Sequence, residues 1–306
     1  MKKNYKTLLM GLVLSASVLA APKVSFAEEA NNDVKKFNYK GNLYAVLDNE
    51  NLECKSLDEM KIYAESLGGH LVYIENAEEN QFVWDLIKAE GSKRSYVLGI
   101  HRDKDTREWK YYNGENVTYT NWAKGEPNRE DEDYVHLYNT TGEWNNTVNI
   151  PRGDEDSFYR LSNMGMVVEW ENEDTRNGHV YQLVDDADVK SLEDMKSYAK
   201  SVGGHLAYIT DAEENQFVWD LIKAKGTKRS YVLGMYRDKD TRVWKYDNGE
   251  DVTYTNWAKG EPNREDEDYV HLYNTTGEWN NTVNVPRGDE DSFYRLSNMG
   301  MIIEWD

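Results

Sequence analysis

The chain has 306 residues and a formal net charge of −20 at pH 7, from 36 lysines and arginines against 56 aspartates and glutamates. Nucleic acid and anionic membranes would be repelled by a protein of this sign, whereas divalent cations and neutral ligands would not. The length is ample for two modest domains, each with its own core.

Residues 1–27 have the pattern of a secretory signal peptide. Basic residues at the start are followed by an apolar run from Leu8 to Ala20 and a small-residue ending at Ala27. A membrane anchor is the alternative, but the run is shorter than a spanning helix requires. We expect cleavage after Ala27 and a secreted, extracellular protein without membrane insertion. Its charge is about −24, because four lysines leave with the peptide.

After an N-terminal segment, residues 28–40, the sequence predicts two helices separated by a short strand. The first begins at Ser56, three residues before Glu59 in a capping-box arrangement, and stops at a glycine pair. Residues 70–74, HLVYI, are typical of a short buried strand. The second helix follows Asn76, an N-cap residue. Its apolar face has spacings of three and four and consists of Phe82, Val83, Leu86 and Ile87.

Several later stretches are rich in aromatic and β-branched residues, which favour strands. They are SYVLGI, REWKYYNGENVTYTNW, DYVHLYN, GEWNN and GMVVEW. Asn113-Gly114 inside the second stretch is a strong hairpin-turn signal. The order strand, helix, strand, helix and then several antiparallel strands and loops predicts an α+β fold.

An acid-rich loop, GEPNREDED, precedes one of these strands. Glu126, Asn128 and Glu132 offer three oxygen ligands within the loop, and Asn145 and Asn146 can bring more from a neighbouring strand. Hard divalent cations, calcium above all, take six to eight such oxygens. The alternative from composition alone is a solvated acidic surface, and no EF-hand pattern is present.

Pro127 lies between two of the candidate ligands. It would hold their side chains convergent, particularly if the Glu126-Pro127 peptide bond is cis.

Most of the chain repeats after 135 residues, so that Trp84 aligns with Trp219 and Glu126 with Glu261. From Val117 to Met166 the copies differ only where Ile150 stands against Val285. A period this long indicates a duplicated domain. We expect domains at residues 41–170 and 179–306, joined by a short charged linker, residues 171–178.

Cysteine and histidine usage restrict the chemistry further. Cys54 is the only cysteine and has no counterpart in the second copy, so no intramolecular disulfide can form. None of the six histidines lies at metal-ligand spacing with another, which argues against a zinc site.

The motifs YVLGI, WKYYNG, TNWAKGEPN, EDYV, GEWNN and VVEW, in this order and spacing, resemble the C-type lectin-like domain. The segment GGHLVYIENAEENQFVWDLI is similar to the first half of that family's domain. The resemblance covers Tyr44 to Trp170 and Tyr181 to Trp305, nearly the whole mature chain. It implies two copies of the lectin fold, each with two helices, antiparallel sheets and a long loop region.

The resemblance also implies a calcium site in each copy, with vicinal sugar hydroxyls bound directly to the ion. The implied metal ligands are Glu126, Asn128, Glu132, Asn145 and Asn146 in the first copy, and Glu261, Asn263, Glu267, Asn280 and Asn281 in the second. The first four of each set would also contact the sugar. The EPN motif resembles the family's mannose-type selectivity, for mannose, fucose or N-acetylglucosamine, rather than its galactose-type QPD.

Three departures from the family pattern stand out. Its WND motif is WNN here, so Asn146 and Asn281 bring neutral amides, and we expect weaker calcium binding. Tyr134 and Tyr269 replace family cysteines, as in bacterial relatives, so a bacterial source is expected. The segments 147–163 and 282–298 are longer than usual, and Asp154, Glu155 and Asp156 would either complete the metal site or lie in a solvated loop.

Two further roles can be considered for residues of this region. Glu126 and Glu132 could form a glycosidase pair, but a calcium-bound carboxylate stays ionised and is no general acid, so we expect no enzyme. Trp144, Trp122 and Tyr134 would either stack on sugars or belong to the core.

The sequence therefore predicts a secreted, calcium-dependent lectin that binds glycans through two domains and does not bind nucleic acid. The alternative is a protein-binding module of the same fold in which calcium is structural or absent.

Overall fold

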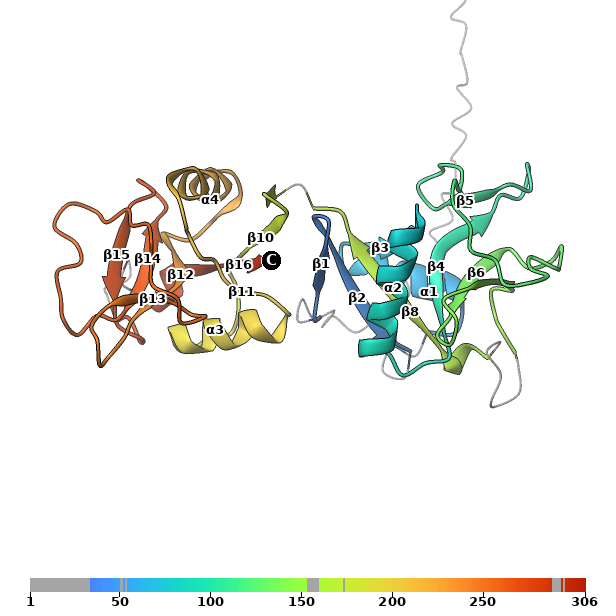
Figure 1. Cartoon of the computed structure of the whole chain (residues 1–306), viewed down its shortest axis with the longest axis horizontal. Helices are drawn as coiled ribbons and strands as arrows, with labels where there is room; N and C mark the ends of the chain where they lie inside the picture. The colour runs from blue at the N-terminus through green and yellow to red at the C-terminus, as the bar shows by residue number, and fades with distance from the viewer. Residues whose placement is uncertain are drawn as a thin grey trace, which may run out of the picture. The chain divides into compact units, whose positions relative to one another are not determined.

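The computed structural model describes residues 34–49, 52, 54–152, 160–172, 174–287, 293 and 295–306. The predicted signal peptide and the three acidic residues at 154–156 lie outside the described residues. Two copies of one α+β architecture follow each other along the chain (Figure 1). Within the described ranges, no helix is both long and apolar enough to cross a membrane.

The first copy is built on an eight-stranded sheet with the strand order β1-β2-β8-β4-β6-β7, to which β3 and β5 add at the sides. Its elements are β1 (Phe37–Tyr39), β2 (Asn42–Asp48), α1 (Leu57–Ser66), β3 (His70–Leu71), α2 (Ala77–Glu90), β4 (Ser95–Arg102), β5 (Trp109–Tyr111), β6 (Tyr134–Tyr138), β7 (Trp144–Thr147), η1 (Leu161–Asn163) and β8 (Met164–Trp170). The first long strand pairs with the last, Leu43 opposite Trp170, so the copy closes on itself.

The second copy repeats this plan, in the order β15-β14-β12-β16-β10-β9. Its elements are β9 (Thr175–Arg176), β10 (His179–Val184), α3 (Leu192–Ser201), β11 (His205–Leu206), α4 (Ala212–Lys225), β12 (Ser230–Arg237), β13 (Trp244–Tyr246), β14 (Tyr269–Tyr273), β15 (Trp279–Thr282), η2 (Leu296–Asn298) and β16 (Met299–Trp305). In Figure 1, α3 and α4 lie on opposite sides of the strands β10, β11 and β16.

Three details differ from the sequence expectation. The sheets are mixed, because β4 runs parallel to β8 and β12 runs parallel to β16. The first sheet begins at Phe37, ahead of the expected domain start at residue 41, and β9 lies within the expected linker, where it pairs with β10. The strand expected at 70–74 is only His70–Leu71, the two residues that pair in register with β8, although the backbone N–H of Val72 still donates to the carbonyl of Val167 at 2.9 Å.

Both helix starts follow from their capping residues. The side chain of Ser56 accepts a hydrogen bond from the backbone N–H of Glu59, and that of Asn76 accepts one from Glu79. The apolar face predicted for α2 faces the core, with Val83 and Ile87 fully buried. Cys54 is buried and free.

Trp144 lies at the centre of the first core and is fully buried, which confirms the core alternative for this residue. Its indole N–H donates to Asn80 Oδ1 on α2 at 2.7 Å. Because the ring fixes the start of β7, it also fixes the two asparagines that follow it. Trp122 packs edge-on against it, with ring centroids 5.8 Å apart.

Candidate functional site

The acid-rich loop of the first copy lies between β5 and β6, next to β7. The peptide bond before Pro127 is cis. Asn128 Nδ2 donates to Glu126 Oε1 at 2.9 Å, so these two side chains converge as expected. Strand β7 brings Asn145 and Asn146 opposite His136 and Val135 of β6.

The side chain of Asn146 ties this loop to the sheet. Its Oδ1 accepts from the backbone N–H of Asn128 at 3.3 Å. Its Nδ2 donates to the backbone carbonyl of Arg129 at 3.0 Å and contacts that of Glu132 at 3.5 Å. The residue is fully buried, and its amide therefore sets the path of the chain through the three loop ligands.

A pocket of about 460 Å³ opens beside this loop. Its polar lining residues are Asn128, Arg129, Glu132, Asn145, Thr147 and Arg152. Val148, Ile150 and Pro151 add an apolar side. The pocket thus brings three of the five predicted ligands together, and Glu126 adjoins them through its hydrogen bond to Asn128.

Glu132 is an anionic group in a buried position, with 8% of the residue exposed. Burial raises its pKa, and the negative charges of Asp131 and Glu126 add to that effect, while Arg129 opposes it. The Arg129 guanidinium lies 3.8 Å from Glu132 Oε1, and the arginine side chain is largely exposed. A cation closer to this carboxylate than Arg129 would favour its ionised form.

Glu126 provides the test of whether the donor set fits a cation. Its Oε1 accepts from Asn128, whereas its Oε2 is buried without a hydrogen-bond partner among the described residues. A buried carboxylate oxygen without a partner is costly, and a bound cation would remove that cost. Two carboxylates and two or more amide oxygens are the donor chemistry that calcium prefers.

The second copy repeats the arrangement closely. Asn263 Nδ2 donates to Glu261 Oε1 at 2.8 Å, and its backbone N–H donates to Asn281 Oδ1 at 3.3 Å. The pocket there, about 390 Å³, is lined by Asn263 and Glu267, and burial raises the pKa of Glu267. One contact differs, because Glu261 Oε2 also accepts from the backbone N–H of Asn263 at 3.1 Å. Asn280, like Asn145, follows the buried tryptophan of its strand.

Sequence reasoning missed two arginines that support the loop. Arg102 at the end of β4 lies over the ring of Trp109, 4.5 Å from its centroid, and contacts the carbonyls of residues 129 and 130 at 3.5 Å. Arg107 forms an ion pair with Asp133 at 2.9 Å. They neutralise part of the loop's charge but leave Glu126 without an ion pair among the described residues. These contacts join residues more than 20 positions apart, so no local sequence pattern indicates them.

Histidines do not enter this site as bases. His136 on β6 and His271 on β14 are fully buried, and desolvation lowers the pKa of each to about 3. They are neutral core residues at physiological pH.

Comparison with known proteins identifies the architecture. The model of the Lectin C-type domain matches residues 53–149 and 188–284, together more than half of the chain. A perlucin-like protein from Mytilus galloprovincialis is 37% identical over 100 residues, which cover 31% of this chain and 64% of that protein. Human C-type lectin domain family 17, member A is 34% identical over 91 residues, or 30% of this chain and 23% of that protein.

Among solved structures, the mouse scavenger receptor C-type lectin carbohydrate-recognition domain is 24% identical with a TM-score of 0.35, covering 45% of this chain and 96% of that one. The chain spans less than two thirds of the length of either curated relative.

These relatives are animal proteins, which contradicts the bacterial source expected from the missing cysteines. A core that packs well does not need the disulfides, so their absence does not indicate the source. The matched family is that of C-type lectin domains, which are not enzymes, in agreement with the expectation that the chain is not an enzyme.

Proposed function

Because the chain belongs to the C-type lectin domain family, we propose that each of its two domains binds one calcium ion and, through it, a neutral sugar of the mannose type. The proposed ligands of the first domain are the side chains of Glu126, Asn128, Glu132 and Asn145, with Asn146 in support. Their counterparts in the second domain are Glu261, Asn263, Glu267, Asn280 and Asn281.

The observation that carries this proposal is the buried, unpartnered Oε2 of Glu126 beside the buried carboxylate of Glu132. Two anionic groups this close repel each other unless positive charge lies between them. Arg107 pairs with Asp133 and Arg102 contacts Glu130 at 3.5 Å, while the largely exposed Arg129 reaches Glu132 only at 3.8 Å, so Glu126 has no ion-pair partner among the described residues. A divalent cation held by these residues would supply the missing charge and could take sugar hydroxyls as further ligands.

Sugar selectivity would come from the order of donors and acceptors around the ion. A carboxylate such as Glu126 only accepts hydrogen bonds, whereas the amide of Asn128 also donates them. The EPN order at 126–128 therefore determines which orientation of two vicinal sugar hydroxyls can form hydrogen bonds to both side chains. This order favours mannose-type sugars over galactose.

The setting fits the proposed chemistry. Signal-peptide cleavage after Ala27 would deliver the protein to the extracellular space, where calcium is plentiful enough for modest sites. Two weak sites on one chain would gain affinity for surfaces that carry many sugars.

Titration calorimetry tests the proposal. The chelator-stripped mature chain is titrated with calcium and then with mannose or galactose, and the Glu126→Gln, Glu261→Gln double variant is run alongside. We expect about two calcium ions per chain, mannose binding only when calcium is present, and loss of both in the variant. A matched control is Glu143→Gln with Glu278→Gln, two acids beyond the loop at the turn before β7 and β15.

The outcomes separate the two functions that the fold allows. Calcium uptake without sugar binding would favour the protein-binding alternative, with calcium in a structural role. An absence of calcium uptake would refute the site, and the loop would be acidic surface stabilised by Arg102 and Arg107.

A further inference from the structure

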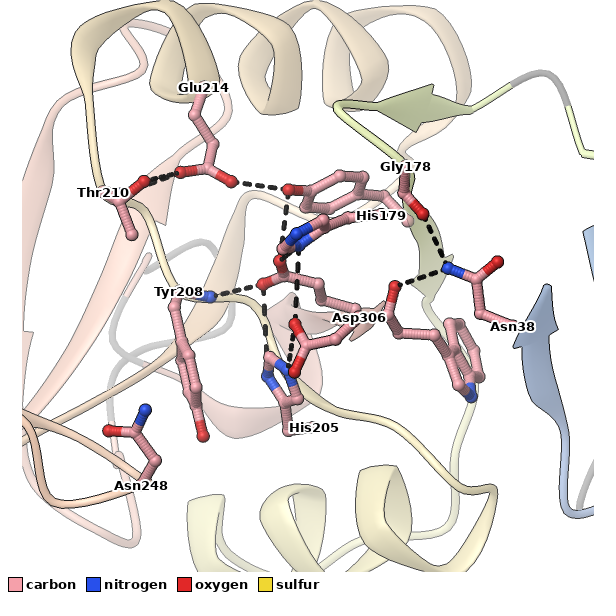
Figure 2. A network of polar contacts seen from close by, with 12 residues as sticks. Asn38, Gly178, His179, His205, Tyr208, Thr210, Glu214, Asn248 and Asp306 are labelled. Carbon is pink, nitrogen blue, oxygen red and sulfur yellow. Dashed lines mark hydrogen bonds and ion pairs between the residues drawn. The ribbon is translucent and has the colours of Figure 1, made fainter. Parts of the chain in front are cut away.

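Four side chains of the second domain form a separate polar cluster around β16. His179 begins β10, His205 begins β11, Glu304 lies on β16 and Asp306 follows it. Strands β10 and β11 both pair with β16, where His205 lies opposite Glu304. The two imidazoles therefore reach the two carboxylates from strands that both pair with β16, and in Figure 2 the side chains of His179 and His205 point toward Asp306.

The separations within the cluster are short. Asp306 Oδ1 lies 3.4 Å from His179 Nδ1 and 3.3 Å from His205 Nε2. His179 Nδ1 is 2.6 Å from Glu304 Oε1, and His205 Nδ1 is 4.0 Å from Glu304 Oε2. One ligand atom each from His179, Glu304 and Asp306 lies within 4.8 Å of the others.

Neighbouring groups orient the cluster as a supporting shell orients metal ligands. His205 Nδ1 lies 2.9 Å from the backbone carbonyl of Leu206. If that nitrogen carries the proton, the lone pair of Nε2 faces Asp306. Glu304 is fixed from the other side, because its Oε2 accepts from the backbone N–H of Tyr208 at 2.9 Å and its Oε1 from the hydroxyl of Tyr181 at 3.2 Å.

The exposed fraction of the side chains increases from one end of the cluster to the other. The side chain of Glu304 is 3% exposed, that of His205 17%, that of His179 40% and that of Asp306 72%. The cluster therefore has a closed base and an open mouth through which an ion can enter.

We propose that the second domain binds a divalent transition-metal ion of the zinc class through His179 Nδ1, Glu304 and Asp306, and that His205, whose Nε2 lies 3.3 Å from Asp306 Oδ1, moves in as the fourth ligand. Tetrahedral zinc with bonds of about 2.0–2.2 Å separates its ligand atoms by about 3.3–3.6 Å. The distances from Asp306 Oδ1 to the two imidazole nitrogens already match that edge. The ion replaces the proton between His179 and Glu304, whose atoms move apart from 2.6 Å as that proton is released.

The spacing of the histidines in the sequence argued against a zinc site, but the fold brings two of them together. The two histidines are 26 residues apart and both are far in sequence from residues 304 and 306. Only the pairing of β10 and β11 with β16 brings them together. The set is also distinct from the acid-rich loop, which contains no histidine.

The equivalent positions of the first domain contain only one of the two imidazoles. Asn42 stands where the second domain has His179, and its Nδ2 donates to Glu169 Oε1 at 2.9 Å. His70 and Glu171 remain, 3.9 Å apart. An amide nitrogen offers no lone pair to a metal, so the first domain retains one histidine ligand and the site is specific to the second domain.

The test is zinc titration of the full mature chain, stripped with chelator and kept in millimolar calcium so that the acid-rich loops do not take up zinc. We expect one zinc ion per chain by calorimetry, and a tetrahedral visible absorption band when cobalt(II) is used instead. His179→Asn should weaken zinc binding by at least about tenfold, the loss that removal of a supporting group alone produces.

The first domain provides the matched variants. His179→Asn installs the residue that the first domain uses at this position, so it suits the fold. His70→Asn removes a histidine without a second imidazole beside it and should leave zinc binding unchanged. Asn42→His should create a second zinc equivalent per chain.

Two results would overturn the proposal. One is no zinc or cobalt uptake by the wild-type chain, which would make the cluster an ion-pair network. The other is uptake that persists in both His179→Asn and His205→Asn, which would place the metal elsewhere. Neither result bears on the proposed calcium site, because that site does not use these four residues. The calcium titration therefore tests the proposed function independently.

Discussion

The side chain of Asn146 holds the backbone of Asn128 in place, through a hydrogen bond of 3.3 Å from the Asn128 N–H to its Oδ1. The same amide reaches the carbonyls of residues 129 and 132 with its Nδ2. A family position that the motif assigns to a calcium ligand is therefore also a structural support of the loop. This double role decides what its substitution will do.

Asn146→Asp with Asn281→Asp should tighten calcium binding and destabilise the calcium-free protein. The new carboxylates add charge for the ion. They also remove the N–H donors to the loop carbonyls, and each lost buried hydrogen bond costs about 1–3 kcal/mol. Calorimetry should show higher calcium affinity, while thermal melting in chelator should show a lower midpoint. Unchanged calcium affinity would contradict the ligand role of these positions.

Acidification should weaken calcium binding, and the loss should begin at a higher pH than it would for ligands with the usual glutamate pKa. Burial raises the pKa of Glu132 and of Glu267 above the usual 4.5. Protons compete with calcium below each raised pKa, so affinity is complete above it and falls as pH decreases through it. Calcium titrations between pH 7 and pH 4 measure this.

In the calcium-free protein the same two glutamates should give folding stability the opposite pH dependence, so that stability increases as the pH falls. A folded-state pKa above the unfolded value means that the folded form binds the proton more tightly. The stabilisation from that proton is complete below the unfolded pKa and is lost as pH rises through the raised one. Glu132→Gln with Glu267→Gln removes this dependence. An unaltered pH profile in that variant would show that other groups cause it.

The sequence predicted the elements of the fold well where local signals were strong. The caps at Ser56 and Asn76 and the buried face of α2 depend on neighbours a few residues apart. The parallel pairing of β4 with β8 and the inclusion of Phe37 in the sheet depend on contacts between distant segments, and no local pattern carries them.

The same distinction applies to the sites. The acid-rich loop is continuous in sequence, so its candidate ligands were visible as a motif. Arg102 joins that loop from the end of β4, and the cluster of His179 and Glu304 joins the two ends of one domain. Tertiary pairing creates both, and they have no linear signature.

Asn80→Ala should destabilise the first domain by about 1–3 kcal/mol, because it leaves the buried indole N–H of Trp144 without its acceptor. Asn215→Ala is the equivalent change in the second domain, where Trp279 donates to Asn215 Oδ1 at 2.7 Å. Scanning calorimetry measures both. Gln81→Ala, an exposed change on the same helix, is the control and should alter stability by less than about 0.5 kcal/mol. Equal effects of Asn80→Ala and Gln81→Ala would show that the buried hydrogen bond is unimportant.

Loss of one lectin site should affect multivalent surfaces far more than soluble sugar. Glu126→Gln alone leaves the second site intact, because its ligands all come from the second domain, so the affinity of that site for free mannose stays the same. Binding to a mannose-coated surface should fall by about 10²–10⁴-fold, since the second contact on one chain is intramolecular. Glu261→Gln should give the same loss, and surface binding by the two single variants and the double variant ranks the contributions. If a single variant binds the surface as tightly as the wild-type chain, the two sites do not engage the surface together.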